Sequence, residues 1–247
     1  MIYFISDLHL GTPSLVASLE REKRFVQWLD RVSADAEAIY IMGDLFDFWF
    51  EYSSVVPKGY VRTLGKLALL RDAGLPIYFF TGNHDLWMFG YFEQELGIPV
   101  YKQPLMCTFN DKTFLIGHGD GLGPKDIGYK LLKKYVFCNP ICQWALRCLH
   151  PDIGVGIANY FSRRSRQARG RQDDDFRGED YEWLLQYARR KLETQHIDYF
   201  VFGHRHYPLD IALNPTSQYI NLGDWLQYYT YAKFDGQQLH LCYDTKK

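Results

Sequence analysis

The sequence predicts an α/β protein with a layered sandwich core, and three observations lead to this prediction. Short apolar runs alternate with segments of helical spacing through the first half of the chain, as expected for a parallel or mixed sheet with crossover helices. The segment from Leu209 to Tyr243 has strand patterns separated by turn sequences, which predicts a second sheet. The 247 residues suffice for one sizeable core. We therefore expect a single domain over residues 1–247, with a helical insertion at about 125–170.

Five apolar runs have the length of buried strands and end in a polar turn. These predicted strands are Ile2–Ile5, Ile39–Met42, Ile77–Phe80, Thr113–Ile116 and Tyr199–Phe202. Helices are predicted where apolar residues recur at helical spacing, or where Gly and Pro stop a helical pattern, and they are Glu20–Val32, Tyr60–Ala73 and Glu179–Thr194. Turn sequences predict reversals at Asn110 and Asp111, at Asn214 and Pro215, and at Asp235 and Gly236.

Composition and charge narrow the function classes. The formal net charge of −1 argues against nucleic-acid binding over the whole surface, so no nucleic-acid partner is expected. The five cysteines are odd in number and lack paired spacing, which favours reduced thiols over a disulfide framework or a structural zinc site. No run approaches the roughly 18 apolar residues of a membrane span. The first residues have a strand pattern and not that of an export signal. We therefore expect a cytoplasmic protein.

Polar residues of the metal-ligand type follow each of the five predicted strands. The clusters are Asp7-Leu8-His9, Gly43-Asp44, Gly82-Asn83-His84-Asp85, Gly117-His118 and Gly203-His204-Arg205-His206. If the strands share one sheet, their carboxyl ends lie at the same edge and the clusters converge. Glycine opens four of the clusters, where it lets the backbone turn without a Cβ clash.

The chemistry of these side chains predicts a dinuclear metal site. A mixed nitrogen and oxygen donor set without thiolate suits Mn²⁺, Fe²⁺ or Zn²⁺ better than a calcium site or a cysteine-ligated zinc site. Two cations about 3.5–4 Å apart can bind a phosphoryl oxygen and hold a bridging hydroxide for in-line attack. Any one cluster alone is more often a turn or an ordinary polar group, and only their joint occurrence indicates the site. The seven candidate ligands, too many for one metal, are Asp7, His9, Asp44, Asn83, His118, His204 and His206.

The ordered set of motifs resembles the calcineurin-like metallophosphoesterases. The shared motifs are Ser-Asp-Leu-His-Leu, Gly-Asp-Leu-Phe-Asp-Phe-Trp, Gly-Asn-His-Asp, Gly-His-Gly-Asp and Gly-His-Arg-His, which span most of the chain between residues 5 and 206. The resemblance implies a four-layer α/β/β/α sandwich and two divalent metal ions, expected to be Mn²⁺. The resemblance implies that one metal is bound by Asp7, His9 and His206. It implies that the second metal is bound by Asn83, His118 and His204, and that Asp44 bridges the two metals.

Within that superfamily, the chain is most similar to the hydrolases of lipid A biosynthesis that cleave UDP-2,3-diacylglucosamine. The similar features are residues 43–49, the helical insertion between the last two histidine blocks, and Asn-Leu-Gly-Asp-Trp at residues 221–225. The implied reaction is attack of a metal-bridging hydroxide on the α-phosphorus, which releases UMP and 2,3-diacylglucosamine 1-phosphate. The expected partner is therefore an acylated UDP-sugar lipid, which Asn83 is expected to contact.

One position departs from that hydrolase group. Its proteobacterial members carry Arg where this chain has His84, whereas the wider superfamily has His held by an acidic neighbour, here Asp85. We expect both residues to be catalytic, with His84 as a general acid or as a stabiliser of phosphoryl charge. The departure leaves open another phosphodiester, a nucleotide or a phosphomonoester as the substrate. A non-enzymatic scaffold is a third hypothesis, which the complete ligand set disfavours.

The insertion, residues 125–168, is rich in aromatic and aliphatic residues. Core packing is one interpretation, and the other is an apolar cap that binds acyl chains, where each buried methylene contributes about 0.8 kcal/mol. The arginine-rich stretch at 163–171 is either solvated or binds phosphates and anionic headgroups. The resemblance implies substrate contacts from Ser165, and we add Arg166 and Arg169. A cap beside a basic stretch predicts peripheral association with the inner face of the inner membrane.

Overall fold

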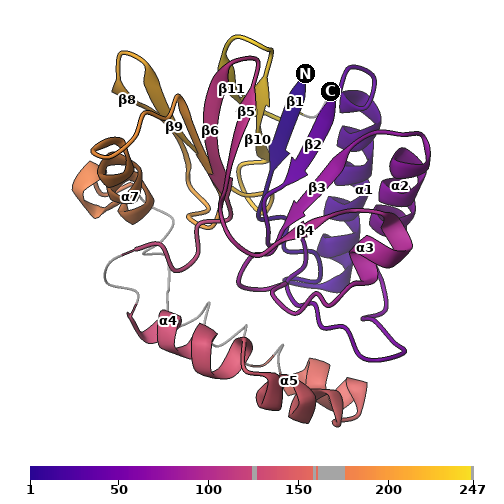
Figure 1. Cartoon of the computed structure of the whole chain (residues 1–247). Coiled ribbons are helices and arrows are strands. Elements are labelled where there is room, and N and C mark those ends of the chain that lie inside the picture. The colour runs from indigo at the N-terminus through magenta and orange to yellow at the C-terminus, as the bar shows by residue number, and fades with distance from the viewer. Residues whose placement is uncertain (124–126, 158–159, 161–175, 246–247) are drawn as a thin grey trace.

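Two sheets packed face to face, with helices on both outer sides, form a four-layer sandwich (Figure 1). This computed structural model describes residues 1–123, 127–157, 160 and 176–245. Helices α1 (Leu15–Val32), α2 (Val61–Asp72) and α3 (Tyr91–Leu96) pack on the first sheet. Helix α7 (Trp183–Leu192), preceded by the short helix η3 (Glu179–Tyr181), packs on the second sheet. The predicted α/β/β/α architecture is confirmed.

The two sheets contain six and five strands. The strands of the first are β1 (Ile2–Ile5), β2 (Ala38–Ile41), β3 (Ile77–Phe80), β4 (Val100–Tyr101), β10 (Thr230–Phe234) and β11 (Leu239–Tyr243). Those of the second are β5 (Leu105–Phe109), β6 (Lys112–Gly117), β7 (Tyr199–Phe202), β8 (Pro208–Asn214) and β9 (Ser217–Leu222). Their orders are β11-β10-β1-β2-β3-β4 and β5-β6-β7-β9-β8. Parallel pairing of β1 to β4, and of β6, β7 and β9, sends the ends of these strands toward one edge of each sheet.

The hydrophobic core follows from the alternation of side chains along each strand. On β1, Tyr3 and Ile5 face the helices, where they join a cluster that includes Trp28 of α1. Ile2 and Phe4 point the other way, into the space between the sheets. Strands β1, β2 and β7 are buried on both faces, which explains why they read as continuous apolar runs in the sequence.

The predicted helices Glu20–Val32 and Tyr60–Ala73 differ from the structure only at their ends. The predicted helix Glu179–Thr194 is instead divided into η3 and α7, because Glu182 between them has an extended backbone. The residues between β5 and β6, Asn110 and Asp111, have φ angles of 44° and 62°, as a two-residue hairpin turn of the primed type requires. Helix α1 begins at Leu15, earlier than the predicted Glu20, because Ser14 caps its first turn by accepting from the N–H of Ala17.

The five motif-bearing strands do not share one sheet, which was the condition under which the sequence predicted that the clusters converge. Strands β1, β2 and β3 belong to the first sheet, whereas β6 and β7 belong to the second. The clusters still converge, because loops from the two sheets bond to one another at the same end of the sandwich. Within each sheet, the N–H of Asp7 donates to the carbonyl of Gly43, and that of Gly203 donates to the carbonyl of His118. Between the sheets, the N–H of His204 donates to the Asp7 carboxylate.

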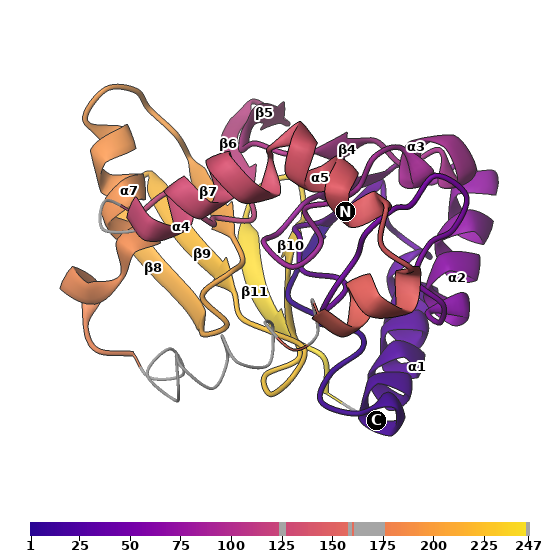
Figure 2. The ribbon, with the colours of Figure 1, turned by 90° about the horizontal axis from the view of Figure 1, so that it is seen from below.

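The insertion forms a helical cap across the end of the sandwich at which the motif strands terminate (Figures 1 and 2). Its described helices are α4 (Ile127–Leu132), the π-helical turn η1 (Lys133–Phe137), α5 (Pro140–Arg147) and a further stretch at 151–157. The indole of Trp87 donates to the carbonyl of Phe137 at 2.8 Å and so ties the cap to the loop after β3. Within the described residues, no helix is both long and apolar enough to cross a membrane.

Candidate metal centre

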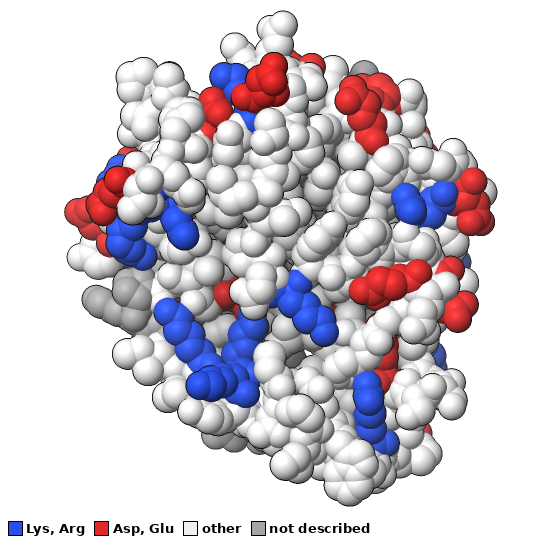
Figure 3. Space-filling view, in the orientation of Figure 1, with Lys and Arg blue, Asp and Glu red and all other residues white. Residues whose placement is uncertain are grey.

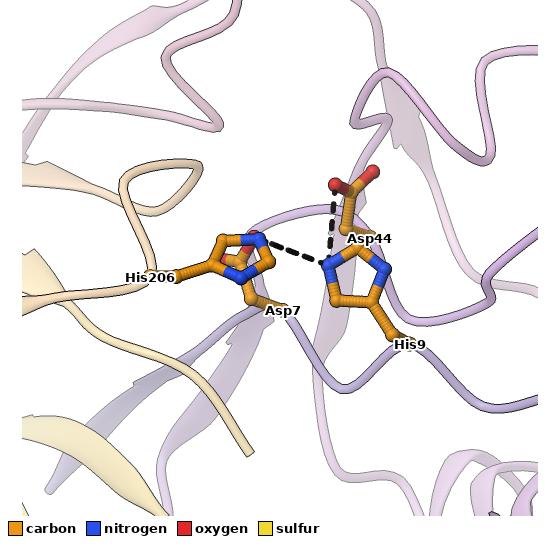
Figure 4. Close-up of side chains that lie close together, drawn as sticks. All are labelled: Asp7, His9, Asp44 and His206. Atoms are coloured by element: carbon orange, nitrogen blue, oxygen red, sulfur yellow. Dashed lines mark hydrogen bonds and ion pairs between the residues drawn. The ribbon is translucent and has the colours of Figure 1, made fainter. Parts of the chain in front are cut away.

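Four of the predicted ligands meet at one point of the sandwich end (Figure 4). Asp7 and His9 follow β1, Asp44 follows β2 and His206 follows β7, and one potential ligand atom of each lies within 4.8 Å of the others. The Nε2 atom of His206 is 3.2 Å from Asp7 Oδ1 and 3.1 Å from His9 Nε2. Imidazole nitrogens and carboxylate oxygens that face a common point form a site for a divalent cation.

A second group of donors lies on the other side of Asp44. The Asp44 Oδ2 atom is 3.6 Å from His9 Nε2 and 3.4 Å from His118 Nε2, so this carboxylate stands between the two groups. The ring of His204 lies 5.1 Å from that of His118, measured between centroids. The position of Asp44 is the one that a carboxylate bridging two metal ions occupies.

Unpaired polar atoms support the fit of metal ions to these residues. The buried Asn83 Oδ1 has no hydrogen-bond partner among the described residues, and the buried His118 Nε2 has only its 3.4 Å approach to Asp44 Oδ2. Such a group costs free energy unless a ligand satisfies it. His118 Nδ1 is bonded to the carbonyl of Met42 at 2.8 Å, which orients the ring and leaves Nε2 as the donor atom. The residues present therefore fit two divalent cations.

The backbone at the ligands is held in conformations that non-glycine residues rarely adopt. Five of the seven predicted ligands have positive φ angles of 45–68°, and these are Asp7, His9, Asp44, His204 and His206. Close packing makes the motif glycines necessary. A Cβ at Gly82 would collide with the Asp44 carboxylate, and one at Gly203 would lie 2.5 Å from Asp7 Oδ2. Such strain persists only where the surrounding structure fixes it, and it clusters at functional sites.

The charges of the site call for a cation. Burial disfavours the charged imidazole of His9, but Asp47, Asp7 and Asp44 outweigh it and raise its pKa to about 10. Burial likewise opposes charge on His118, and the Asp44 carboxylate raises the pKa of that ring to about 10. For Asp44, burial acts to raise the pKa, but the neighbouring histidines hold it well below its usual value. The carboxylates thus create a potential that stabilises positive charge.

His204 differs from the other two imidazoles. Burial, together with the charge of His118, lowers the pKa of His204 to about 4. The ring therefore stays neutral at physiological pH, which is the state in which imidazole binds a metal.

The sequence predicts that Asp85 holds His84, and this prediction is wrong. The Asp85 carboxylate instead accepts backbone N–H bonds from Gly82 at 2.7 Å, Leu45 at 2.8 Å and Asp44 at 3.3 Å. It thereby joins the loops after β2 and β3. Burial, with the nearby charge of Asp44, raises the pKa of Asp85 to about 7. Asp85 is a positioning residue for the ligand loops.

Asp47 is the acidic neighbour that orients the histidines. His84 Nδ1 donates to the carbonyl of Asp47 at 2.8 Å, and His9 Nδ1 lies 3.5 Å from Asp47 Oδ1. Both rings therefore turn their Nε2 atoms away from Asp47. This role of Asp47 was not predicted from the sequence, although Asp47 stands three residues after Asp44, inside the second motif.

The Asn-Leu-Gly-Asp-Trp motif supports the loop that carries His204 and His206. Asn221 Nδ2 donates to the carbonyl of Gly203 at 2.6 Å, and Asp224 Oδ2 lies 3.7 Å from His206 Nδ1. The N–H of Trp225 donates to the carbonyl of Asp7 at 3.0 Å. The motif therefore orients ligands that come from both sheets. Three expected substrate contacts, Ser165, Arg166 and Arg169, lie outside the described residues.

Comparison with known proteins agrees with this geometry. Residues 1–208 match the family described as calcineurin-like phosphoesterase. A protein of Porphyromonas gingivalis named UDP-2,3-diacylglucosamine hydrolase is 37% identical, over 97% of this chain and 96% of the relative. A protein of the same name from Actinobacillus succinogenes is 31% identical, over 90% and 91%.

Among solved structures, the phosphoesterase YfcE from E. coli aligns with a TM-score of 0.46 at 15% identity, over 96% of this chain and 90% of that one. The family match covers most of the chain and includes all seven predicted ligands. This protein therefore belongs to the calcineurin-like phosphoesterase family and is a metal-dependent hydrolase.

Proposed function

We propose that the protein hydrolyses UDP-2,3-diacylglucosamine to UMP and 2,3-diacylglucosamine 1-phosphate. The observation that carries the proposal is a phosphoesterase metal centre beneath an apolar cap, in a chain that matches hydrolases of that name along nearly its whole length. The cap lies within the matched length, so the similarity covers the part of the chain suited to the lipid as well as the part suited to the phosphates.

The metal ions supply Lewis acidity toward phosphoryl oxygens and a nucleophile at neutral pH. Asp7, His9 and His206 would hold one ion, Asn83, His118 and His204 would hold the second, and Asp44 would contact both. In the reaction, an oxygen derived from water forms a bond to the α-phosphorus, and the bond from that phosphorus to the bridging oxygen breaks. The sugar phosphate leaves with the electron pair.

His84 acts on the phosphoryl group in this proposal. Its Nδ1 is engaged by the carbonyl of Asp47, so Nε2 is the atom that remains for the substrate. The ring centroid lies 4.8 Å from that of His9, which supports a position for His84 beside the first metal. A proton at Nε2 stabilises charge on the phosphoryl oxygens or passes to the leaving oxygen.

We infer that the metal is Mn²⁺. The donors are imidazole, carboxylate and amide groups, and none of the candidate ligands is a cysteine. Such a set suits Mn²⁺, and it gives neither the thiolates of a structural zinc site nor the all-oxygen shell of calcium.

The cap is the acyl-binding part of the proposed enzyme. Neither α4, η1 nor α5 contains a buried residue, so the apolar side chains of these helices do not form a core of their own. Ile141 is 74% exposed and Trp144 is 66% exposed on the short helix α5. Apolar side chains concentrated over a metal centre, and not satisfied by packing, are what two fatty acyl chains need.

The same surface suits a lipid bilayer, from which the substrate is drawn. We propose that the protein is cytoplasmic and associates peripherally with the inner face of the inner membrane. Lysines on α4 and η1 flank the apolar side chains of the cap, and such cations are attracted to anionic headgroups.

The test is release of UMP from UDP-2,3-diacylglucosamine by the Mn²⁺-loaded protein, beside a chromogenic phosphodiester. With the reaction run in ¹⁸O-labelled water, the label is expected in UMP and not in the sugar phosphate. Turnover of the chromogenic ester without the lipid would contradict the substrate, and label in the sugar phosphate would contradict the site of attack.

A further inference from the structure

A small cavity lies beside His118, where the sandwich meets the cap. Its lining includes His118 and Asp120 from the loop after β6, Lys102 from the segment after β4, and Lys133 from the cap. The cavity volume is about 20 Å³, roughly the space of one water molecule or one phosphate oxygen. Two lysines and one acidic residue therefore line a space next to the second metal position, and that space has about the size of a single oxygen atom.

Asp120 determines where Lys133 lies. Its Oδ2 atom accepts from Lys133 Nζ at 2.6 Å and from the Tyr129 hydroxyl at 2.7 Å, and its side chain is only 6% exposed. Lys130 Nζ adds a bond of 2.6 Å to the carbonyl of Gly123. Because Asp120 is two residues from His118, these bonds connect the cap directly to a ligand loop.

Lys102 borders the cavity from the sandwich. Its Nζ lies 5.6 Å from the centroid of the Phe89 ring, and the Arg147 guanidinium from α5 lies 4.3 Å from the same centroid. No ion pair joins Lys102 to a carboxylate within the residues that the structure describes. Figure 3 shows Lys and Arg side chains gathered on this face, around the junction of sandwich and cap. The charge of Lys102 is therefore available to an anion.

We propose that Lys102 and Lys133 form a phosphate subsite beside the metal centre, with Asp120 as its positioning residue. The subsite takes an oxygen of the phosphate that stays with the sugar, an identification that rests on the proposed function. The metal ions bind oxygens of the attacked phosphate, whereas a diphosphate carries a second group that needs donors of its own. The two lysines supply these donors, and the subsite thereby favours diphosphates over phosphomonoesters.

The test compares binding of glucosamine 1-phosphate and glucosamine to the Mn²⁺-loaded protein by calorimetry. The matched pair of variants is Lys133→Met and Lys134→Met, since the two lysines are adjacent in η1 and only Lys133 lines the cavity. Lys133→Met is expected to weaken glucosamine 1-phosphate binding about tenfold, the effect of one charge-assisted hydrogen bond, and Lys134→Met is not. Binding of glucosamine is expected to be equal in all three proteins.

Lys102→Met tests the subsite from the sandwich side and is expected to weaken glucosamine 1-phosphate binding by the same factor. This variant replaces Lys133→Met in the test if Lys133→Met has a lowered melting temperature. Wild-type affinity for glucosamine 1-phosphate in both folded variants would overturn the subsite. That result would leave the proposed function standing if the lipid is hydrolysed. Failure of the wild type to hydrolyse the lipid would instead refute the proposed function and leave the binding result intact.

The positioning role of Asp120 is tested by a double-mutant cycle. Asp120→Asn is expected to weaken glucosamine 1-phosphate binding severalfold in the wild-type background and to have little further effect in Lys133→Met. An equal loss in both backgrounds would mean that Asp120 acts on the site without Lys133, and it would overturn this assignment.

Discussion

The metal centre and the cap are built on opposite principles. Around the metal centre, ligands such as Asp7, His9 and Asp44 are at most 1% exposed, hydrogen-bonded through several loops and held at unusual φ angles. In the cap, helices α4 and α5 contain no buried residue, and α4 and η1 bond to the sandwich at Trp87 and Asp120. The difference fits the proposed function, in which the sandwich performs the chemistry and the exposed cap selects the substrate.

The largest effect is expected at the bridging carboxylate. Asp44→Ala should abolish hydrolysis of both the lipid and the chromogenic phosphodiester, because Asp44 faces donors of both metal groups. Turnover and manganese content are measured together. The control is Asp210→Ala, which removes an exposed carboxylate on β8 and should retain both. Near-normal turnover in Asp44→Ala would contradict the dinuclear assignment.

His84→Ala is expected to lower the turnover rate by about 10²–10⁴-fold, the usual contribution of a general acid. Manganese content should stay at the wild-type level, since His84 is not among the proposed ligands. Elemental analysis beside the rate measurement distinguishes the roles. Loss of metal from this variant would show that His84 is a ligand and not a group that acts on the phosphoryl oxygens.

Substitutions in the sandwich and in the cap should differ in their effect on the free energy of unfolding as well as in their effect on activity. Phe4 is fully buried between the sheets, with its ring 5.3 Å from that of Tyr40, so Phe4→Ala should lower the free energy of unfolding by about 3–5 kcal/mol. Ile141→Ala on the exposed cap should change it by less than about 0.5 kcal/mol. Denaturant unfolding measures both. A large loss in Ile141→Ala would mean that the cap packs as a core.

The smallest effect is expected for single apolar residues of the cap. Trp144→Ser should lower kcat/KM for the acylated substrate about tenfold, because one large apolar side chain contributes about 1.5–3 kcal/mol when it is buried. Leu69→Ser is the control, since Leu69 is 60% exposed on α2, outside the cap. An equal loss of kcat/KM in the two variants would contradict a role of the cap in lipid recognition.

The fold and most ligand positions could be predicted because their causes are local in the sequence. Buried strands such as β1 and β7 read as apolar runs, and each ligand follows such a run within a short polar motif. The division of strands between two sheets could not be predicted, because it depends on which strands pair and not on the pattern within any one of them. The convergence of the clusters was predicted on the condition of one shared sheet, and it arises instead from loops of two sheets that bond to one another.

The residues that orient the ligands were harder to predict than the ligands themselves. Asp47 contacts His84 and His9, and each of these histidines lies on a different loop from Asp47. Asp224 lies beside His206 only because β9 pairs with β7. Asp85 stands next to His84 in the chain, yet its carboxylate binds the backbone of a different strand end. Adjacency in sequence suggested the wrong partner, because hydrogen bonds at this site follow loop packing.

The division of labour between sandwich and cap is tested most directly by comparing kcat/KM for UDP-2,3-diacylglucosamine and for UDP-N-acetylglucosamine, with UMP as the product of both. The nucleotide and diphosphate are the same, so only the acyl chains differ. Burial of as few as four methylenes is worth about 3 kcal/mol, and we predict a preference of at least about a hundredfold for the acylated substrate. Equal values for the two substrates would contradict the account.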